Sequence, residues 1–167
     1  MSTLYNKFIN SGLDYSVISL ESTENYYPYW CYPENATPIG LEGCILYCFI
    51  DGYGDMVFSA NPESCADINV YPVARSFEDF LGLILTWTEA NPVEQIIWMN
   101  ETQFSEHVKN EKEIYKKEKE PLLQFIGSLG VKETDDPFSY VKELQKDFDY
   151  SKIIFSDEYY DILGIER

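Results

Sequence analysis

The strongest hydrophobic signal in the chain is the uninterrupted apolar run CILYCFI, from Cys44 to Ile50. Apolar side chains on both faces are typical of a strand inside a sheet, because successive residues of a strand point to opposite sides. The next residues, DGYG, contain an Asp-Gly pair that favours a tight turn, and residues 55–60, DMVFSA, follow as a second strand. The pattern predicts a β-hairpin over residues 43–60 at the centre of the fold.

A helical period begins after Ser76, which stands at an N-cap position with Asp79 three residues later, the spacing of a capping box. The apolar residues that follow fall on one helix face: Phe77, Phe80, Leu81, Ile84 and Leu85. Glu78 and Asp79 have the composition of a general acid–base pair, but carboxylates in a first helical turn are stabilised by the helix dipole. We therefore assign both to the start of a helix over Ser76–Glu89, which Asn91-Pro92 ends.

One residue of this helix breaks the rules of helix propensity. A glycine inside a helix costs about 1 kcal/mol relative to alanine. Gly82 occupies such a position. We therefore expect another part of the backbone to approach the helix closely at this point.

The remaining segments give weaker signals. They predict a helix over residues 4–10, an edge strand over Tyr15–Leu20, an edge strand or ordered loop in the aromatic run Asn25–Tyr32, a short strand over Asp67–Tyr71 and a short helix or turn over Pro92–Met99. After these come a helix capped by Asn100 and Gln103 that continues to Ile126, a helix over Phe138–Phe148, a strand over Lys152–Phe155 and a turn from Asp157. The middle of the first of these helices, KNEKEIYKKEKEP, mixes both signs of charge and is either a solvated helix face or a mobile connector. Strands followed by helices predict an α+β fold with a central, mostly antiparallel sheet.

Length and composition indicate one globular domain over residues 1–167, since 45% of the residues are hydrophobic and 25% are charged. No signal-peptide pattern opens the chain, and no apolar run approaches the roughly 18 residues of a membrane span. We therefore expect a cytoplasmic protein.

Few residues are suited to metal, redox or nucleophilic chemistry. The four cysteines form no CxxC motif, and His107 is the single histidine. Zinc and thiol redox sites need tighter clusters, so the sequence predicts buried reduced thiols, no metal and no cofactor. Asp51 and Asp55 flank the hairpin turn and offer either a carboxylate pair or a calcium loop. They lack the spacing of an EF-hand, and a turn accounts for them.

Charge is strongly uneven along the chain. Residues 1–106 contain 15 acidic residues against Lys7 and Arg75, a net charge of −13, whereas residues 107–167 carry −4. Such a field disfavours nucleic acids and anionic membranes, both of which bind through lysine and arginine. It favours a basic protein partner, because opposite charges accelerate encounter.

Three segments together resemble a known family. DGYGDMVFSANPESCADINVYPVARSFEDFLGLIL, EQIIWMNETQF and YVKELQKDFDYSKI follow one another as in the SUKH superfamily, which includes yeast regulators of cell-wall synthesis and many bacterial immunity proteins. The resemblance is clearest over residues 40–108, and residues 1–40 retain only an echo of the family pattern. It implies a single SUKH-like domain with a helical extension from about residue 100, a non-catalytic role and, for the bacterial members, the neutralisation of toxins, many of them nucleases.

These observations lead to a hypothesis of an immunity protein that occludes a basic toxin. The expected contact residues combine acids with aromatic rings, the residue types suited to steering and anchoring: Glu21, Glu24, Tyr26, Tyr27, Tyr29, Trp30, Glu34, Asp51 and Asp55. The alternatives are a regulatory or scaffold protein that binds a small ligand or glycan on the YYPYW aromatics, and, more weakly, a carboxylate hydrolase. The sequence leaves the oligomeric state open.

Overall fold

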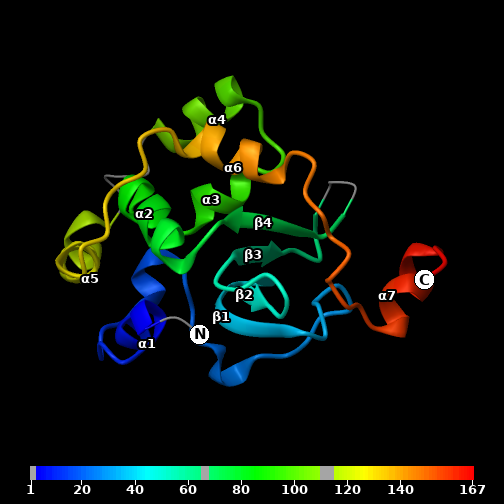
Figure 1. Ribbon diagram of the computed structural model, residues 1–167. Helices are drawn as coiled ribbons and strands as arrows, with labels where there is room; N and C mark the ends of the chain where they lie inside the picture. Colours follow the sequence, from blue (N-terminus) through cyan, green and yellow to red (C-terminus); the bar gives the residue numbers. More distant parts are fainter. Residues whose placement is uncertain (1–2, 65–67, 110–114) are drawn as a thin grey trace.

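The computed structural model describes residues 3–64, 68–109 and 115–167. Figure 1 shows a central sheet with helices around it. The elements follow one another along the chain as α1 (Thr3–Ile9), η1 (Ser16–Ile18), η2 (Thr23–Asn25), β1 (Ala36–Glu42), β2 (Ile45–Ile50), β3 (Val57–Ala60), β4 (Val70–Ala74), α2 (Phe77–Trp87), α3 (Asn91–Gln95), α4 (Glu101–His107), α5 (Lys116–Ser128), α6 (Pro137–Gln145) and α7 (Asp157–Leu163). The four strands lie in the order β1-β2-β3-β4, all antiparallel. The predicted α+β class with a central antiparallel sheet is confirmed.

The predicted hairpin forms the middle of this sheet. β2 and β3 pair in the register Leu46 with Ala60 and Phe49 with Val57. The run CILYCFI is apolar throughout because both faces of β2 are buried: Tyr47 and Phe49 belong to the core under the helices, and Leu46, Cys48 and Ile50 to the core on the other side. The strand expected at Asp67–Tyr71 overlaps β4 only at Val70 and Tyr71, because β4 runs on to Ala74, residues 68 and 69 form a bend, and Asp67 lies outside the described residues.

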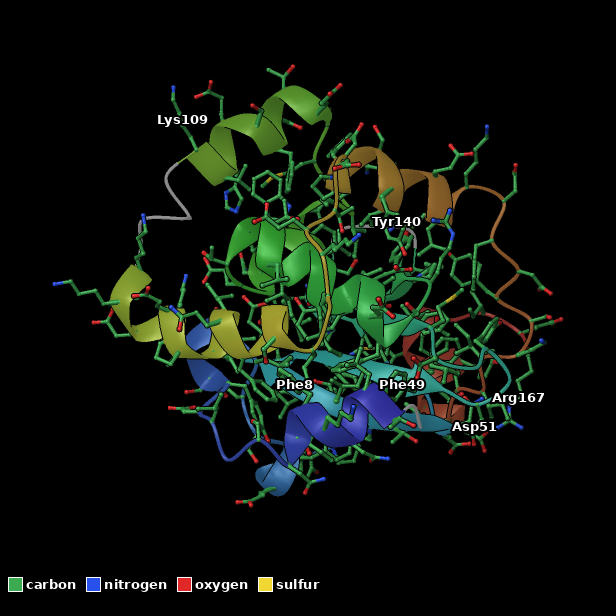
Figure 2. All side chains as sticks on the ribbon, turned by 60° about the vertical axis from the view of Figure 1, so that its left-hand side comes forward. Phe8, Phe49, Asp51, Lys109, Tyr140 and Arg167 are labelled. Atoms are coloured by element: carbon green, nitrogen blue, oxygen red, sulfur yellow. The ribbon has the colours of Figure 1, made fainter. Side chains whose placement is uncertain are left out.

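On one face of the sheet, α1 and α2 enclose an aromatic cluster centred on Phe77. The ring centroid of Phe77 lies 5.2 Å from that of Tyr5, 5.5 Å from Phe8 and 6.0 Å from Phe49. Aromatic pairs at such distances contribute about 0.5–1.5 kcal/mol each beyond their buried area. In Figure 2, Phe8 and Phe49 lie in the space between α1 and the sheet. The predicted helix over residues 4–10 therefore closes this face.

The opposite face is covered by irregular chain and α7. Residues 26–33 and 148–155 lie over it, and Phe148 packs against Phe58 of β3 with 5.7 Å between ring centroids. Figure 1 shows α7 on the side of the sheet away from α2 and α5. The aromatic run at 25–32 is therefore an ordered loop, one of its two predicted forms.

The edge strand β1 was not predicted, because Pro38 and Gly40 are poor strand residues. Pro38 is tolerated because the register shifts between Pro38 and Gly40 and the strand lies at the sheet edge. Gly40 is required by packing: a Cβ there would lie 2.4 Å from Cδ1 of the buried Leu20. Contact with Leu20, twenty positions earlier, therefore explains why position 40 is a glycine.

Two strand predictions are wrong. Residues 15–20 contain the 3-10 turn η1, and the backbone bridges to the sheet at the next residue, Glu21, opposite Leu41. Lys152 lies in a turn, and residues 153–155 form no ladder in the described structure. The segment is held to the chain that follows the aromatic run by the Glu34 N–H, which donates to Ile154 O at 2.8 Å, and by the side chain of Asn35. Apolar residues in both segments reflect burial against the core, not strand pairing.

Helix boundaries also differ from expectation. The predicted capping box of Asn100 and Gln103 is present, but the helix it starts ends at His107, and α5 begins after Tyr115, whose φ is +52°. The middle of the predicted helix, 110–114, lies outside the described residues. α2 ends at Trp87, and Pro92 lies in the first turn of α3, where a missing N–H is not needed.

The two carboxylates at the start of α2 have structural partners. Ser76 Oγ accepts the Asp79 N–H at 3.0 Å, which is the N-cap bond of the predicted capping box. Asp79 Oδ2 accepts the hydroxyl of Tyr140 at 2.8 Å, which attaches α6 to α2. Glu78 is exposed in the same first turn. The interpretation of Ser76 and Asp79 as helix-start residues is confirmed.

The close approach predicted at Gly82 is present. A Cβ on Gly82 would lie 2.7 Å from the backbone oxygen of Lys132 and 3.2 Å from Thr134 Oγ1. Thr86, one turn later, receives the Thr134 N–H at 2.8 Å and so holds the same segment against α2. The glycine therefore lets residues 132–134 pack directly on the helix backbone.

We expect Gly82→Ala to lower the free energy of unfolding by about 1–2 kcal/mol, because the clash with a backbone atom outweighs the gain in helix propensity. Gly127→Ala in α5 is the matched control, since nothing lies within 4 Å of the added Cβ. It should be neutral or stabilise by up to about 1 kcal/mol. Urea denaturation measures the change in the free energy of unfolding for both variants. Changes of the same sign in the two variants would contradict the packing role of Gly82.

Candidate functional site

The most distinctive surface of the molecule is built by the aromatic loop, residues 26–36, between η2 and β1. Tyr32 fixes the loop, because its ring is buried and its hydroxyl donates to Cys44 O at 2.6 Å. Its backbone N–H donates to Tyr29 O at 3.0 Å and closes a turn around Trp30. Pro28 and Pro33 restrict the backbone further. The rings are therefore presented by an ordered scaffold.

The rings of the aromatic loop contact one another. Tyr26 stacks on Tyr32 at 5.8 Å between centroids, and Tyr29 meets Tyr32 edge to face at 5.4 Å. Trp30 stacks at 5.8 Å on Tyr159, which belongs to α7. Two segments more than a hundred residues apart thus form one aromatic surface.

These rings border a hollow of about 460 Å³, which we call the aromatic hollow. Four of the predicted contact residues line it together: Tyr26, Tyr29, Trp30 and Glu34. Its remaining lining comes from the same loop and from the start of α7: Pro28, Tyr32, Pro33, Ala36, Ser156 and Glu158. The structure therefore brings part of the predicted contact set into one concave site.

The other predicted residues lie outside this hollow. Tyr27 projects beside it with 78% of its surface exposed, and Glu21 and Glu24 are exposed on the preceding segment. Asp51 is exposed in the β2–β3 turn, and its backbone pairs with Asn35 at 3.0 Å. Asp55 accepts the Phe77 N–H at 3.2 Å, so its carboxylate caps α2. Asp51 and Asp55 therefore have separate surroundings rather than a shared site.

Asn35 connects the aromatic loop to the segment that leads into α7. Its side-chain Nδ2 donates to Asp51 O at 3.2 Å and to Lys152 O at 3.0 Å, while its Oδ1 accepts the Ile154 N–H at 3.0 Å. Lys152 Nζ in turn donates to Gly52 O at 2.9 Å. These bonds hold the segment before α7 beside the hairpin.

The electrostatics of the hollow are negative. Its two charged lining residues, Glu34 and Glu158, are both exposed glutamates. The chain from Phe8 to Ala74 contains no lysine, arginine or histidine. Burial raises the pKa of the Tyr26 and Tyr32 phenols, so both hydroxyls stay protonated near neutral pH. The site combines aromatic faces with carboxylates, which suits a cationic group.

Sequence reasoning missed the contribution of α7. Ser156 accepts the Tyr159 N–H at 3.4 Å as the helix N-cap, and this places Glu158 and Tyr159 in the first turn at the hollow. The Ser156-Asp157-Glu158 triplet is a recognisable helix start, but its position beside the aromatic loop depends on the fold. No local pattern contains that information.

A buried polar cluster lies elsewhere, between β1, β3 and α3. Glu94 is fully buried, and its carboxylate accepts Asn61 Nδ2 at 2.7 Å and Gln95 Nε2 at 2.9 Å. Glu42 accepts the side-chain amide of Asn91 and the hydroxyl of Tyr47. Burial raises the pKa of Glu94 to about 7 and also raises that of Glu42. Because Glu94 is shielded from solvent, we assign this cluster to the fold, not to a site.

A larger hollow of about 650 Å³ lies between the end of α2 and α5. Its lining includes long charged side chains of both signs, among them Lys116, Lys117 and Glu120. Such side chains are mobile at a surface and do not preorganise a site. The aromatic hollow, with ordered rings and one sign of charge, is the better candidate.

Thiol and metal chemistry receive no support from the described part of the chain. Cys31, Cys44 and Cys48 are free thiols, and burial raises the pKa of Cys31 to about 12, which disfavours the reactive thiolate. Cys65 lies outside the described residues. Among residues 3–64, 68–109 and 115–167, no three His, Cys, Asp or Glu side chains are grouped as metal ligands. Within the same ranges, no helix is both long enough and apolar enough to traverse a bilayer.

Comparison with known proteins gives no relative: no protein-family profile, no curated protein and no solved structure matches this chain.

Proposed function

We propose that this chain is a non-catalytic binding protein that neutralises a basic partner protein, such as a nuclease toxin, by covering its functional surface. One observation carries the proposal. Tyr26, Tyr29, Trp30 and Glu34 were selected from the sequence as contacts, and they line one hollow whose charged residues are both acidic. Ordered aromatic rings surrounded by charge of one sign are typical of interface centres and their rims.

The charge distribution supports a basic partner. The chain carries a net charge of −17, and the long stretch without basic residues contains the aromatic loop. An acidic surface raises the encounter rate with a basic protein and repels nucleic acid, so it suits a protein that competes with nucleic acid for a nuclease. The α+β fold and the SUKH-like order of motifs are compatible with an immunity role.

The partner is identified by co-purification of the tagged protein from its native host at low and then high salt. Specific recovery of a basic protein, weakened by salt, is the expected result, because exposed charges are screened at high ionic strength. The recovered protein is then assayed for toxicity with and without this chain. A toxic activity that this chain fails to suppress would contradict the occlusion proposal.

Charge-reversal variants test which face of this protein binds the basic partner. We expect Glu21→Lys, Glu24→Lys and Glu34→Lys together to slow association with the recovered partner roughly tenfold at low salt. Glu120→Lys, Glu133→Lys and Glu143→Lys, three exposed acids on or near α5 and α6, form the control set. Each set changes the net charge by six units, from −17 to −11. Stopped-flow association rates that fall equally in both sets would contradict binding through the aromatic loop.

A regulatory or scaffold protein that binds a glycan or small ligand is the second candidate, and the aromatic hollow is the observation that favours it. Its volume falls within the roughly 300–1,000 Å³ of small-molecule sites. Calorimetry with soluble oligosaccharides separates the two candidates, because occlusion of a basic protein predicts no heat from a neutral sugar.

A further inference from the structure

The lining of the aromatic hollow restricts the chemistry of its occupant. Four tyrosine or tryptophan side chains, two prolines and an alanine supply apolar surface, and the carboxylates of Glu34 and Glu158 supply the only formal charges in that lining. An anionic group would be repelled by both carboxylates and would meet no cation there. A group that carries positive charge gains from the carboxylates and from the negative faces of the rings.

Among cationic side chains, the geometry favours arginine. The guanidinium group is planar, so it stacks on tyrosine and tryptophan rings, and its fork of N–H donors matches a carboxylate. It is also more weakly hydrated than the lysine ammonium, so it loses less hydration free energy when it is transferred out of water. Tyr29, with 45% of its surface exposed, and Glu34 lie on the same ordered loop.

The hollow is built before any ligand arrives. Tyr32 is anchored through its hydroxyl to Cys44 O at 2.6 Å, and it supports the rings of Tyr26 and Tyr29. Trp30 is supported from the other side by Tyr159 of α7. A site whose side chains are already ordered loses little conformational entropy when it binds.

We propose that the aromatic hollow is a receptor for an arginine side chain of the basic partner, which stacks on the rings and pairs with Glu34 and Glu158. This inference rests on the proposed function and adds the chemical identity of the group at the centre of the interface. It also predicts that the partner loses affinity when one exposed arginine is replaced.

The test uses a small probe and the full chain. The capped peptide acetyl-Gly-Arg-Gly-amide is titrated into the ¹⁵N-labelled protein, and the amide resonances of residues 26–36 and 156–158 are followed. We expect these resonances to shift with a dissociation constant on the order of 1–10 mM, as for a single side-chain contact. The same peptide with citrulline, which is isosteric and neutral, should bind about tenfold more weakly or not at all.

Matched variants locate the site. Tyr29→Leu keeps an apolar side chain but removes a ring from the hollow, and about fivefold weaker binding of the arginine peptide is expected. Tyr27→Leu changes a neighbouring exposed tyrosine outside the lining and should leave binding unchanged. Glu34→Gln should weaken the arginine peptide and leave the citrulline peptide unaffected. The far-ultraviolet circular dichroism of each variant verifies that the fold is retained.

Several outcomes would overturn the inference. These are equal binding of the citrulline peptide, shifts dispersed over the acidic surface instead of residues 26–36 and 156–158, or no shift up to about 50 mM peptide. An oligosaccharide that shifts these resonances where the peptide does not would also overturn it, in favour of a glycan site. If the arginine peptide does not bind but reversal of Glu21, Glu24 and Glu34 still slows association with the basic partner, the arginine inference is wrong and the proposed function is retained. If the peptide binds as expected and charge reversal has no effect on any recovered protein, the proposed function fails instead.

Discussion

Replacing Lys119 by methionine is expected to lower the free energy of unfolding by about 3–5 kcal/mol, the largest effect we anticipate for a single substitution. Only 1% of the Lys119 side chain is exposed, and its Nζ lies 3.2 Å from Glu89 Oε2. The pair joins α5 to the turn after α2. Ser19 Oγ also lies 3.2 Å from the same carboxylate oxygen, so three segments meet at Glu89.

The expected loss comes from removing one member of a shielded ion pair. The two atoms are close enough to attract strongly, although the ammonium is not aligned for a hydrogen bond in the described structure. Methionine preserves most of the volume of the lysine stem but removes the ammonium from beside the carboxylate of Glu89, only 12% exposed. Removing one member of a shielded ion pair is costly even where the intact pair contributes little net stability.

A double-mutant cycle separates these terms. Urea denaturation is measured for Lys119→Met, for Glu89→Leu and for the two changes combined. We expect the combined variant to be more stable than Lys119→Met alone, because the carboxylate is then removed together with the ammonium. Additive losses in the cycle would show that the pair does not couple and that Lys119 acts only through packing.

The stability of the wild-type protein is expected to fall between about pH 4.5 and pH 8 because of Glu94. Burial is the main cause that raises the pKa of this carboxyl to about 7 from a usual 4.5. Below pH 4.5 the group is protonated in both the folded and unfolded states. As the pH rises through 7, the folded protein must ionise a buried group, and its contribution of up to about 3 kcal/mol is lost.

Glu94→Gln removes this titration and keeps the shape of the protonated side chain. The difference in unfolding free energy between the variant and the wild type should move in favour of the variant by up to about 3 kcal/mol from pH 4.5 to pH 8. Glu42→Gln should show a change of the same sign, because burial also raises the pKa of Glu42. The measurement is a series of urea denaturations across this pH range.

Asp136→Asn provides the contrasting control. Hydrogen bonds from Ser139 lower the pKa of the Asp136 carboxyl, which caps α6. Its stabilising contribution is therefore present above its usual pKa and is lost as the pH falls below it, the opposite of Glu94. Wild-type and Glu94→Gln stabilities that run parallel from pH 4.5 to pH 8 would refute the raised pKa of Glu94.

Local patterns were sufficient where the determining contacts are local. The caps of Ser76 and Asn100 each depend on residues three positions apart, and both are present as predicted. The Asp-Gly turn after β2 likewise required only neighbouring residues. Gly82 is a partial exception: the sequence showed that something approaches α2, and the structure identifies it as the backbone of Lys132.

Elements that depend on distant partners were not predictable in the same way. β1 contains Pro38 and Gly40 because of its edge position and the nearby Leu20, and no window of the sequence contains both facts. The segment at 152–155 was predicted as a strand, but it is held by the backbone of Glu34 and the side chain of Asn35, more than a hundred residues earlier, and not by a neighbouring strand. The hydrophobic pattern of a segment indicates which of its residues are buried, but it does not indicate which other segment they pack against.

The same distinction between local patterns and distant contacts applies to the candidate functional site. Composition and charge by themselves determined that residues 21–34 combine acidic and aromatic side chains, because side-chain chemistry is independent of the fold. Only the tertiary structure decided that Tyr26, Tyr29, Trp30 and Glu34 share one hollow, and that Ser156 and Glu158 of the α7 start complete it. It also placed Asp55 as a cap on α2. A concave site is made by contacts between distant segments, and those contacts exist only once the chain has folded.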